Sequence, residues 1–116
     1  MLLCSFSIYS QNQSDKSDKS DKSIVACIAF YNLENFFDTI KDPARNDEDY
    51  TPNGKYHWNT EKYNNKLKNI SKVISELGNE LVKGGPVIMG IAEVETTEIL
   101  KDLVNTDFGR TADQSP

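Results

Sequence analysis

Apolar runs alternate with long polar stretches along this chain, and the apolar runs define its elements. Residues 24–31 are rich in Ile, Val, Ala and Phe and are bounded by polar residues, which predicts a buried strand. Residues 87–91 predict a second one. Between the two strands, apolar residues recur at spacings of three and four, which predicts an amphipathic helix. These residues are Leu67, Ile70, Ile74, Leu77 and Leu81.

Helix signals frame this pattern. Thr60 suits the N-cap of the first helix, and residues 83–86, Lys-Gly-Gly-Pro, are typical of a helix stop. Thr96 or Thr97 can cap a second helix, which has the apolar stripe Ile99, Leu100, Leu103 and Val104. The order strand, helix, strand predicts an α/β fold with a parallel pair and a right-handed crossover. Both strands then end at the same edge of the sheet.

A polar residue follows each predicted strand. Asn32 comes after the first strand and Glu93 after the second. Because ligand sites of parallel sheets lie beyond the carboxyl ends of the strands, we expect these two side chains to lie close together. Carboxylate oxygen suits hard divalent cations, so Glu93 is a candidate metal ligand. The residues alone also allow an Asx turn at Asn32 and a solvated strand-end acid at Glu93.

The sequence motifs around both residues are similar to those of a known family. Phe-Tyr-Asn-Leu-Glu-Asn-Phe-Phe-Asp at 30–38 and Gly-Ile-Ala-Glu-Val-Glu at 90–95 resemble the endonuclease/exonuclease/phosphatase family, the metal-dependent phosphodiesterases related to DNase I. The resemblance covers residues 24–105. It implies the N-terminal strand-helix-strand portion of a DNase I-like two-sheet α/β sandwich, truncated before the remaining strands.

The resemblance also implies roles and ligands. Glu93 would bind a divalent metal, Mg²⁺ or else Mn²⁺ or Ca²⁺, and Asn32 would contact the scissile phosphate or orient the metal shell. The partner would be a phosphate-ester substrate, possibly a nucleic acid. Ala92 departs from the family pattern, in which Gln often precedes the Glu.

Other parts of the family's machinery have no match in this chain. No position corresponds to the Ser-Asp-His type motif of the catalytic histidine, or to the later aspartates and asparagine. We therefore expect a fragment of a phosphoesterase with negligible activity by itself. The alternative is a non-enzymatic exported fragment or a small binding protein. His57 suits surface packing better than catalysis. Glu95 shares a side with Glu93 only if extended geometry continues, so it is a weaker candidate.

A long loop is predicted at residues 38–59. It contains two prolines and an acidic cluster at 47–49, and such loops are usually functional or mobile. We expect Tyr50, Tyr56 and Trp58 to pin it to the body. Pro52 stands where a calcium-binding loop needs glycine, which excludes that motif. No glycine-rich turn follows the first strand, which excludes a dinucleotide-binding unit.

The N-terminal part differs in composition from the rest. Residues 1–13 read as a signal-peptide remnant, which favours an exported, periplasmic or extracellular protein, and their apolar run is too short to span a bilayer. Residues 14–23 are Ser-Asp-Lys units without an apolar face, which predicts a disordered linker. Residues 24–116 would form the N-terminal part of the endonuclease/exonuclease/phosphatase domain.

The net charge and the cysteine content exclude several classes of function. The Ser-Asp-Lys units are neutral overall, so the formal net charge of −5 belongs to residues 24–116. Such an acidic body repels phosphate, which argues against a simple nucleic-acid coating module and calls for a bound metal to reverse the local field. Cys4 and Cys27 match neither a disulfide framework nor a zinc signature, and Cys27 is expected to be a buried apolar residue.

Overall fold

A computed structural model describes residues 2–5, 26–80, 83 and 85–106. Within these residues the elements are β1 (Leu2–Ser5), β2 (Ile28–Phe36), the short 3₁₀ helix η1 (Glu48–Tyr50), α1 (Thr60–Glu76), β3 (Ile88–Val94) and α2 (Thr97–Val104). The linker predicted at 14–23, most of the signal remnant predicted at 1–13, and Leu81 lie outside the described residues. None of the described helices is both long and apolar enough to cross a membrane.

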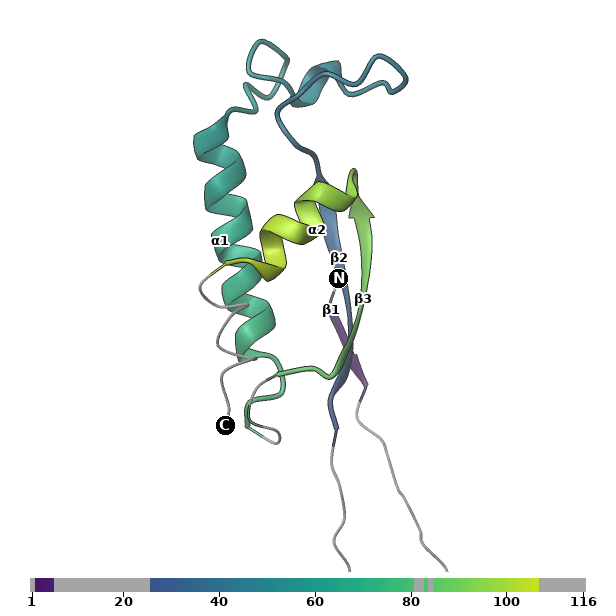
Figure 1. Cartoon of the computed structure of the whole chain (residues 1–116), viewed down its shortest axis with the longest axis vertical. Helices are drawn as coiled ribbons and strands as arrows, with labels where there is room; N and C mark the ends of the chain where they lie inside the picture. The colour runs from purple at the N-terminus through teal and green to yellow at the C-terminus, as the bar shows by residue number, and fades with distance from the viewer. Residues whose placement is uncertain (1, 6–25, 81–82, 84, 107–116) are drawn as a thin grey trace, which may run out of the picture.

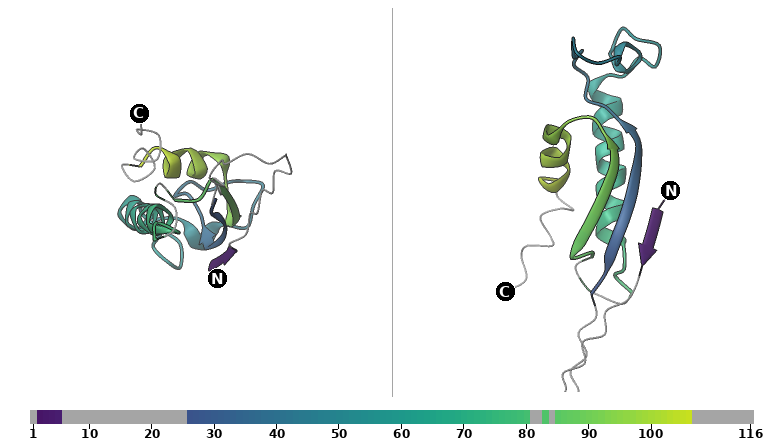
Figure 2. Two further views of the ribbon diagram at one scale, coloured as in Figure 1. Left: turned by 90° about the horizontal axis from the view of Figure 1, so that it is seen from below. Right: turned by 90° about the vertical axis from the view of Figure 1, so that its right-hand side faces the viewer.

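The sheet has the order β1-β2-β3 (Figures 1 and 2). β2 and β3 are parallel, with Ile28 beside Ile88, and α1 connects them, which confirms the predicted α/β class and the strand-helix-strand order. β1 pairs antiparallel with β2 from Leu2 beside Tyr31 to Ser5 beside Ile28. The sequence analysis predicted no strand there. By pairing with β2, β1 covers an edge that would otherwise expose unpaired backbone groups.

Both helices lie on one side of the sheet, where the core forms (Figures 1 and 2). Phe36 and Ile99 are fully buried at its centre, and the apolar side of α1 packs against them. Cys27 is also fully buried, as the sequence predicted. The fully or largely buried residues of this core cluster are Leu33, Phe36, Ile70, Ile99 and Leu103.

The alternation of buried side chains reverses within β2. Ala29 and Leu33 are buried at odd-numbered positions, as expected for one face of a strand, but the next buried residue is Phe36. The backbone explains the change, because Glu34 and Asn35 adopt left-handed conformations with φ of 52° and 55°. Two additional residues relative to β3 are thereby accommodated in a bulge, and the buried positions change from odd-numbered to even-numbered.

β3 reverses its alternation at the same level of the sheet. Ile91 and Val94 both pack against the core, and Glu93 between them has φ of 58°. The pairing register is regular up to Asn32 beside Ala92 and resumes at Phe36 beside Val94. Residues 33–35 of β2 therefore lie opposite Glu93 alone. The two strands carry one shared irregularity near their carboxyl ends.

This irregularity corrects the predicted strand ends. We expected strands at 24–31 and 87–91, but β2 continues to Phe36 and β3 to Val94. Asn32 and Glu93 consequently lie inside the strands and not beyond them. The bulge allows this because it tolerates polar residues without breaking the ladder.

The helix ends also differ from the predictions. The N-cap of α1 is Asn59, not Thr60, and Asn59 Oδ1 accepts a hydrogen bond of 3.0 Å from Lys62 N. α1 ends at Glu76, well before the Lys-Gly-Gly-Pro stretch, because Leu77 leaves the helical conformation and Gly78 follows with φ of 72°. In α2, Thr96 is the N-cap, but Val104 is 64% exposed and does not join the core.

The long loop at 38–59 is pinned by aromatic residues, as predicted. The rings of Phe37 and Tyr50 stack with centroids 4.1 Å apart, and Tyr56 packs against Tyr50 at 5.0 Å. Trp58 Nε1 donates a hydrogen bond of 2.9 Å to Phe37 O. These contacts tie the middle of the loop and its carboxyl end to Phe37, the residue that follows β2.

A buried carboxylate organises the first half of this loop. Asp47 is 2% exposed, and its oxygens accept hydrogen bonds from Lys41 Nζ at 2.7 Å and from Asp42 N at 2.9 Å. Lys41 Nζ also donates to Arg45 O at 2.7 Å. The hydrogen bond with Lys41 lowers the pKa of Asp47, and the same contact raises the pKa of Lys41. The pair therefore fixes the backbone path from Lys41 to Asp47.

The pKa of Asp47 predicts an acid transition of the loop. A carboxyl group whose pKa is lowered on folding stabilises the fold above its unfolded pKa of about 3.9, and the stabilisation is lost as the pH falls through the folded value. Trp58, the only tryptophan, reports on the loop by fluorescence. We expect its emission to change below about pH 4, and we expect Asp47→Asn to show the acid spectrum already at pH 7. The exposed neighbour Asp49, changed to Asn, should behave as wild type, and a normal spectrum of Asp47→Asn at pH 7 would contradict this role.

Candidate metal and phosphate site

Asn32 and Glu93 meet across the β2–β3 pair, as the sequence predicted. Asn32 Nδ2 donates a hydrogen bond of 2.8 Å to Glu93 Oε1, although the two residues are 61 positions apart in the sequence. The second carboxylate oxygen, Oε2, accepts from the backbone N–H of Asn35 at 3.1 Å. An amide and a carboxylate are thus held together at the end of the sheet where parallel sheets bind ligands.

The left-handed conformation of Glu93 makes this contact possible. In a regular strand, residues 91 and 93 point to the same face, which would direct the Glu93 carboxylate toward the core beside Ile91. The positive φ turns it away, and its side chain is exposed and reaches Asn32. A left-handed conformation costs a residue with a Cβ roughly 1–2 kcal/mol. Such strain is found where function requires a special geometry.

The bulge in β2 supplies the other half of the arrangement. Asn32 Oδ1 accepts from Glu34 N at 2.8 Å, which is the Asx turn that the sequence allowed. Asn32 therefore makes this turn and contacts Glu93 through its other amide atom. Lys66 of α1 donates from Nζ to Glu34 O at 2.6 Å, and its ammonium lies 5.3 Å from the Phe36 ring centre. Partial burial lowers the pKa of Lys66, while the charges of Glu34 and Glu93 oppose that change.

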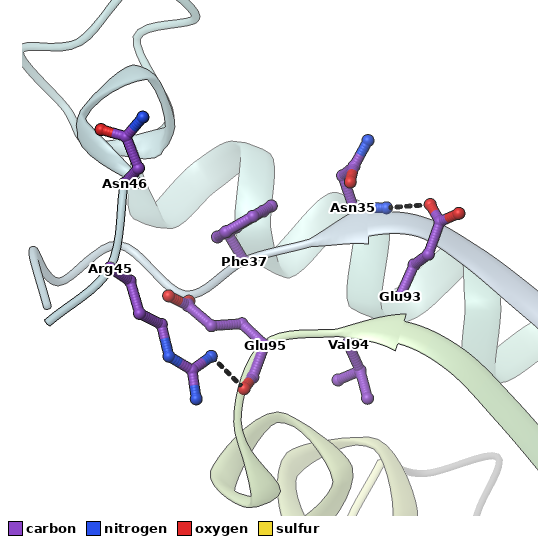
Figure 3. Close-up of a pocket in the computed structure, with 7 residues that line it drawn as sticks. All are labelled: Asn35, Phe37, Arg45, Asn46, Glu93, Val94 and Glu95. Atoms are coloured by element: carbon purple, nitrogen blue, oxygen red, sulfur yellow. Dashed lines mark hydrogen bonds between the residues drawn. The ribbon is translucent and has the colours of Figure 1, made fainter.

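A pocket of about 340 Å³ opens beside Glu93 (Figure 3). This volume is at the small end of the roughly 300–1,000 Å³ typical of ligand pockets. One end is formed by Asn35 and Glu93, and the opposite end by Arg45 and Asn46 of the long loop. Phe37, Val94 and Glu95 line it between these ends. The pocket thus joins the strand ends to the loop that Asp47 holds in place.

Glu95 also faces this pocket. Its Oε2 accepts from Asp38 N at 3.0 Å, whereas its Oε1 is buried and has no hydrogen-bond partner among the residues of known position. Burial raises the pKa of the Glu95 carboxyl, and the negative charges of Asp38 and Asp47 act in the same direction. The regular alternation that would pair Glu95 with Glu93 is interrupted by the left-handed Glu93. Both acids nevertheless line one pocket.

The donor set fits a hard divalent cation that keeps most of its water. In the part of the chain that is described, no group of three or more His, Cys, Asp or Glu residues could enclose a metal. Magnesium does not need such an enclosure, since it is usually held by one or two carboxylates, waters and substrate phosphate. Glu93 retains lone pairs beyond its two hydrogen bonds, and Glu95 contributes a second carboxylate residue to the lining of the same pocket.

Other residues considered from the sequence lie elsewhere or play structural parts. His57 is exposed in the loop with φ of 45° and does not line the pocket. Phe36 is fully buried in the core, whereas Phe37 is only half-buried and lines the pocket. Sequence reasoning did not identify Arg45 or Lys66 as site residues. No local signal marks either one, because their positions depend on the loop path and on helix packing.

Comparison with known proteins identifies the family. A protein-family model with the description "Endonuclease/Exonuclease/phosphatase family" matches residues 27–113, which is most of the chain. No curated protein and no solved structure matches the chain. The chain belongs to the endonuclease/exonuclease/phosphatase family, and its α/β fold is that of the DNase I-like opening portion predicted from the sequence. This is a family of nuclease-like and phosphatase-like phosphoesterases that generally depend on divalent metal.

The left-handed conformation of Glu93 predicts that glycine is more stabilising than alanine at this position, which is the reverse of the usual order. Both Glu93→Gly and Glu93→Ala remove the carboxylate, but only glycine adopts the positive φ freely. We expect the Gly variant to be more stable than the Ala variant by about 1 kcal/mol in urea unfolding. Lys68, exposed in the middle of α1, is the matched control, where Gly should be less stable than Ala by about 1 kcal/mol. The same order at both positions would rule out the left-handed Glu93.

Proposed function

We propose that this chain carries the metal-binding and phosphate-binding part of a divalent-metal-dependent phosphoesterase that acts on phosphodiester or phosphomonoester bonds. The observation that supports it best is the Glu93 carboxylate, which is held by Asn32 and by the Asn35 N–H at the rim of a pocket. Mg²⁺ is the proposed ion, with Mn²⁺ or Ca²⁺ as substitutes. The family match supports the same reaction class.

Each residue has a distinct task in this proposal. Glu93 holds the cation, and the two hydrogen bonds that it accepts fix the direction of its carboxylate. Asn32 has a second amide hydrogen beyond the one given to Glu93, and that hydrogen is offered to a phosphate oxygen. When bound, the cation would polarise the phosphoryl oxygens and stabilise the leaving oxyanion. Glu95 adds a second acid to the pocket.

Hydrolysis also requires a group that activates the attacking water, and no residue of this chain matches the family's motif for that role. No position corresponds to the family's histidine in its Ser-Asp-His type motif, so nothing in this chain is proposed to activate the attacking water. We therefore propose binding of metal and phosphate ester with negligible turnover by residues 1–116 alone. Export is proposed on the composition of residues 1–13, although residues 2–5 of that stretch pair with β2.

Metal binding tests this proposal directly. Titration of the purified chain with Mn²⁺, followed by electron paramagnetic resonance of the free ion, should reveal one site that Mg²⁺ competes for. Glu93→Gln should weaken it by about tenfold or more, since even groups outside the ligand shell cost about 10- to 100-fold. Glu98→Gln on the exposed surface of α2 is the control and should leave the affinity unchanged. Equal affinity of wild type and Glu93→Gln would refute the assignment of Glu93.

A further inference from the structure

We infer that Arg45, together with Asn46, forms a subsite for a second phosphate group, so that the preferred ligand is a chain of successive phosphodiesters such as a single-stranded oligonucleotide. This inference rests on the proposed function, in which the first phosphate lies at Glu93 and Asn32. Glu93 and Arg45 lie at opposite ends of the same pocket (Figure 3). A ligand that reaches from one end to the other therefore meets a separate cationic group.

The charges of the pocket require such a group. Glu93 and Glu95 both line it and both repel phosphate, whereas Arg45 is the single cation among its lining residues. A metal at Glu93 would compensate the charge at that end only. Arg45 gives the other end a permanent positive charge, since a guanidinium stays protonated at all ordinary pH values.

Protein contacts orient the Arg45 guanidinium but engage only some of its N–H donors. Its Nη1 donates to Glu95 O at 2.6 Å, and its Nε lies 3.3 Å from Asp42 Oδ2. Nη2 makes no hydrogen bond or ion pair with any residue that the structure places. The side chain is 50% exposed, and the ion pair with Asp42 is an exposed one that contributes little. The planar fork therefore keeps N–H donors for an incoming phosphate.

The backbone beneath Arg45 is held in advance. Lys41 Nζ donates to Arg45 O at 2.7 Å and to the buried carboxylate of Asp47. Asn46 lies between Arg45 and Asp47 and contributes a neutral amide to the same end of the pocket. Because the loop is already ordered, little conformational entropy remains to be lost when a ligand binds.

The pocket wall between the two ends favours a nucleotide unit over a bare polyphosphate. Phe37 lines it, and its ring stacks on Tyr50 at 4.1 Å with an interplanar angle of 15°. An aromatic residue supported in this way offers an apolar surface between two phosphate-binding ends. Bases stack on aromatic side chains with little dependence on sequence.

Binding of a labelled oligothymidylate of about eight nucleotides to the whole chain, measured by fluorescence anisotropy in the presence of CaCl₂, tests the inference. We expect Arg45→Ala to raise the Kd roughly tenfold, in line with the loss of a charge-assisted contact. Arg45→Lys, which keeps the charge but not the fork, should lie between Arg45→Ala and wild type. Lys101→Ala, an exposed cation of α2, should bind as wild type does. Unchanged Trp58 emission in Arg45→Ala verifies that the loop is intact.

The outcomes separate this inference from the proposed function. If Glu93→Gln weakens Mn²⁺ binding while Arg45→Ala binds the oligonucleotide as wild type does, the subsite is wrong and the metal site stands. If Arg45→Ala weakens oligonucleotide binding although Glu93→Gln leaves Mn²⁺ affinity unchanged, the subsite stands without the metal. Absence of oligonucleotide binding by the wild type overturns the subsite. Inorganic phosphate should bind Arg45→Ala and wild type equally, because a single phosphate occupies the Glu93 end, and a loss there as well would contradict a second subsite.

Discussion

The structure depends on one irregularity that β2 and β3 share, in which residues 33–35 lie opposite Glu93 alone. It keeps Leu33 and Phe36, and likewise Ile91 and Val94, on the core face although their spacing is odd. A regular ladder would have to bury either the apolar residues before the bulge or those after it, but not both sets. The cost is a left-handed backbone at Glu34, Asn35 and Glu93.

The same irregularity creates the site. The backbone turn that keeps Val94 in the core also carries the Glu93 carboxylate out to Asn32 and to the freed N–H of Asn35. Folding and site geometry are therefore coupled, since Lys66 of α1 contacts the bulge carbonyls while packing near Phe36. The loop at 38–59 begins directly after β2, and its anchor at Asp47 brings Arg45 to the same pocket. The strained backbone thus lies at the candidate site, as is often seen at binding sites.

Sequence reasoning predicted the two parallel strands, the two α-helices and the meeting of Asn32 with Glu93, because hydrophobic periodicity and crossover handedness are properties of the chain itself. It did not predict the bulge, although Glu34 and Asn35 interrupt an otherwise apolar stretch. Asn tolerates a positive φ, but Glu does not favour one. Residue propensities therefore give no indication of the left-handed conformation at Glu93. Strand β1 was also missed, because the apolar residues 2–5 were interpreted as part of a signal-peptide remnant, and their pairing with the distant β2 has no local signal. The position of Arg45 depends on the path of a loop that is determined by the salt bridge between Lys41 and the buried Asp47.

The central claim is that a divalent cation binds where Glu93 meets Asn32 and Asn35. Addition of Mn²⁺ to the ¹⁵N-labelled chain, followed by ¹H–¹⁵N NMR, locates the ion, because a paramagnetic metal broadens the signals of nearby nuclei. The account predicts that the side-chain amide of Asn32 and the backbone amides of Asn35 and Glu93 broaden first. Broadening that begins instead at the acidic turn of Asp47 to Asp49, while those three signals stay sharp, would contradict it.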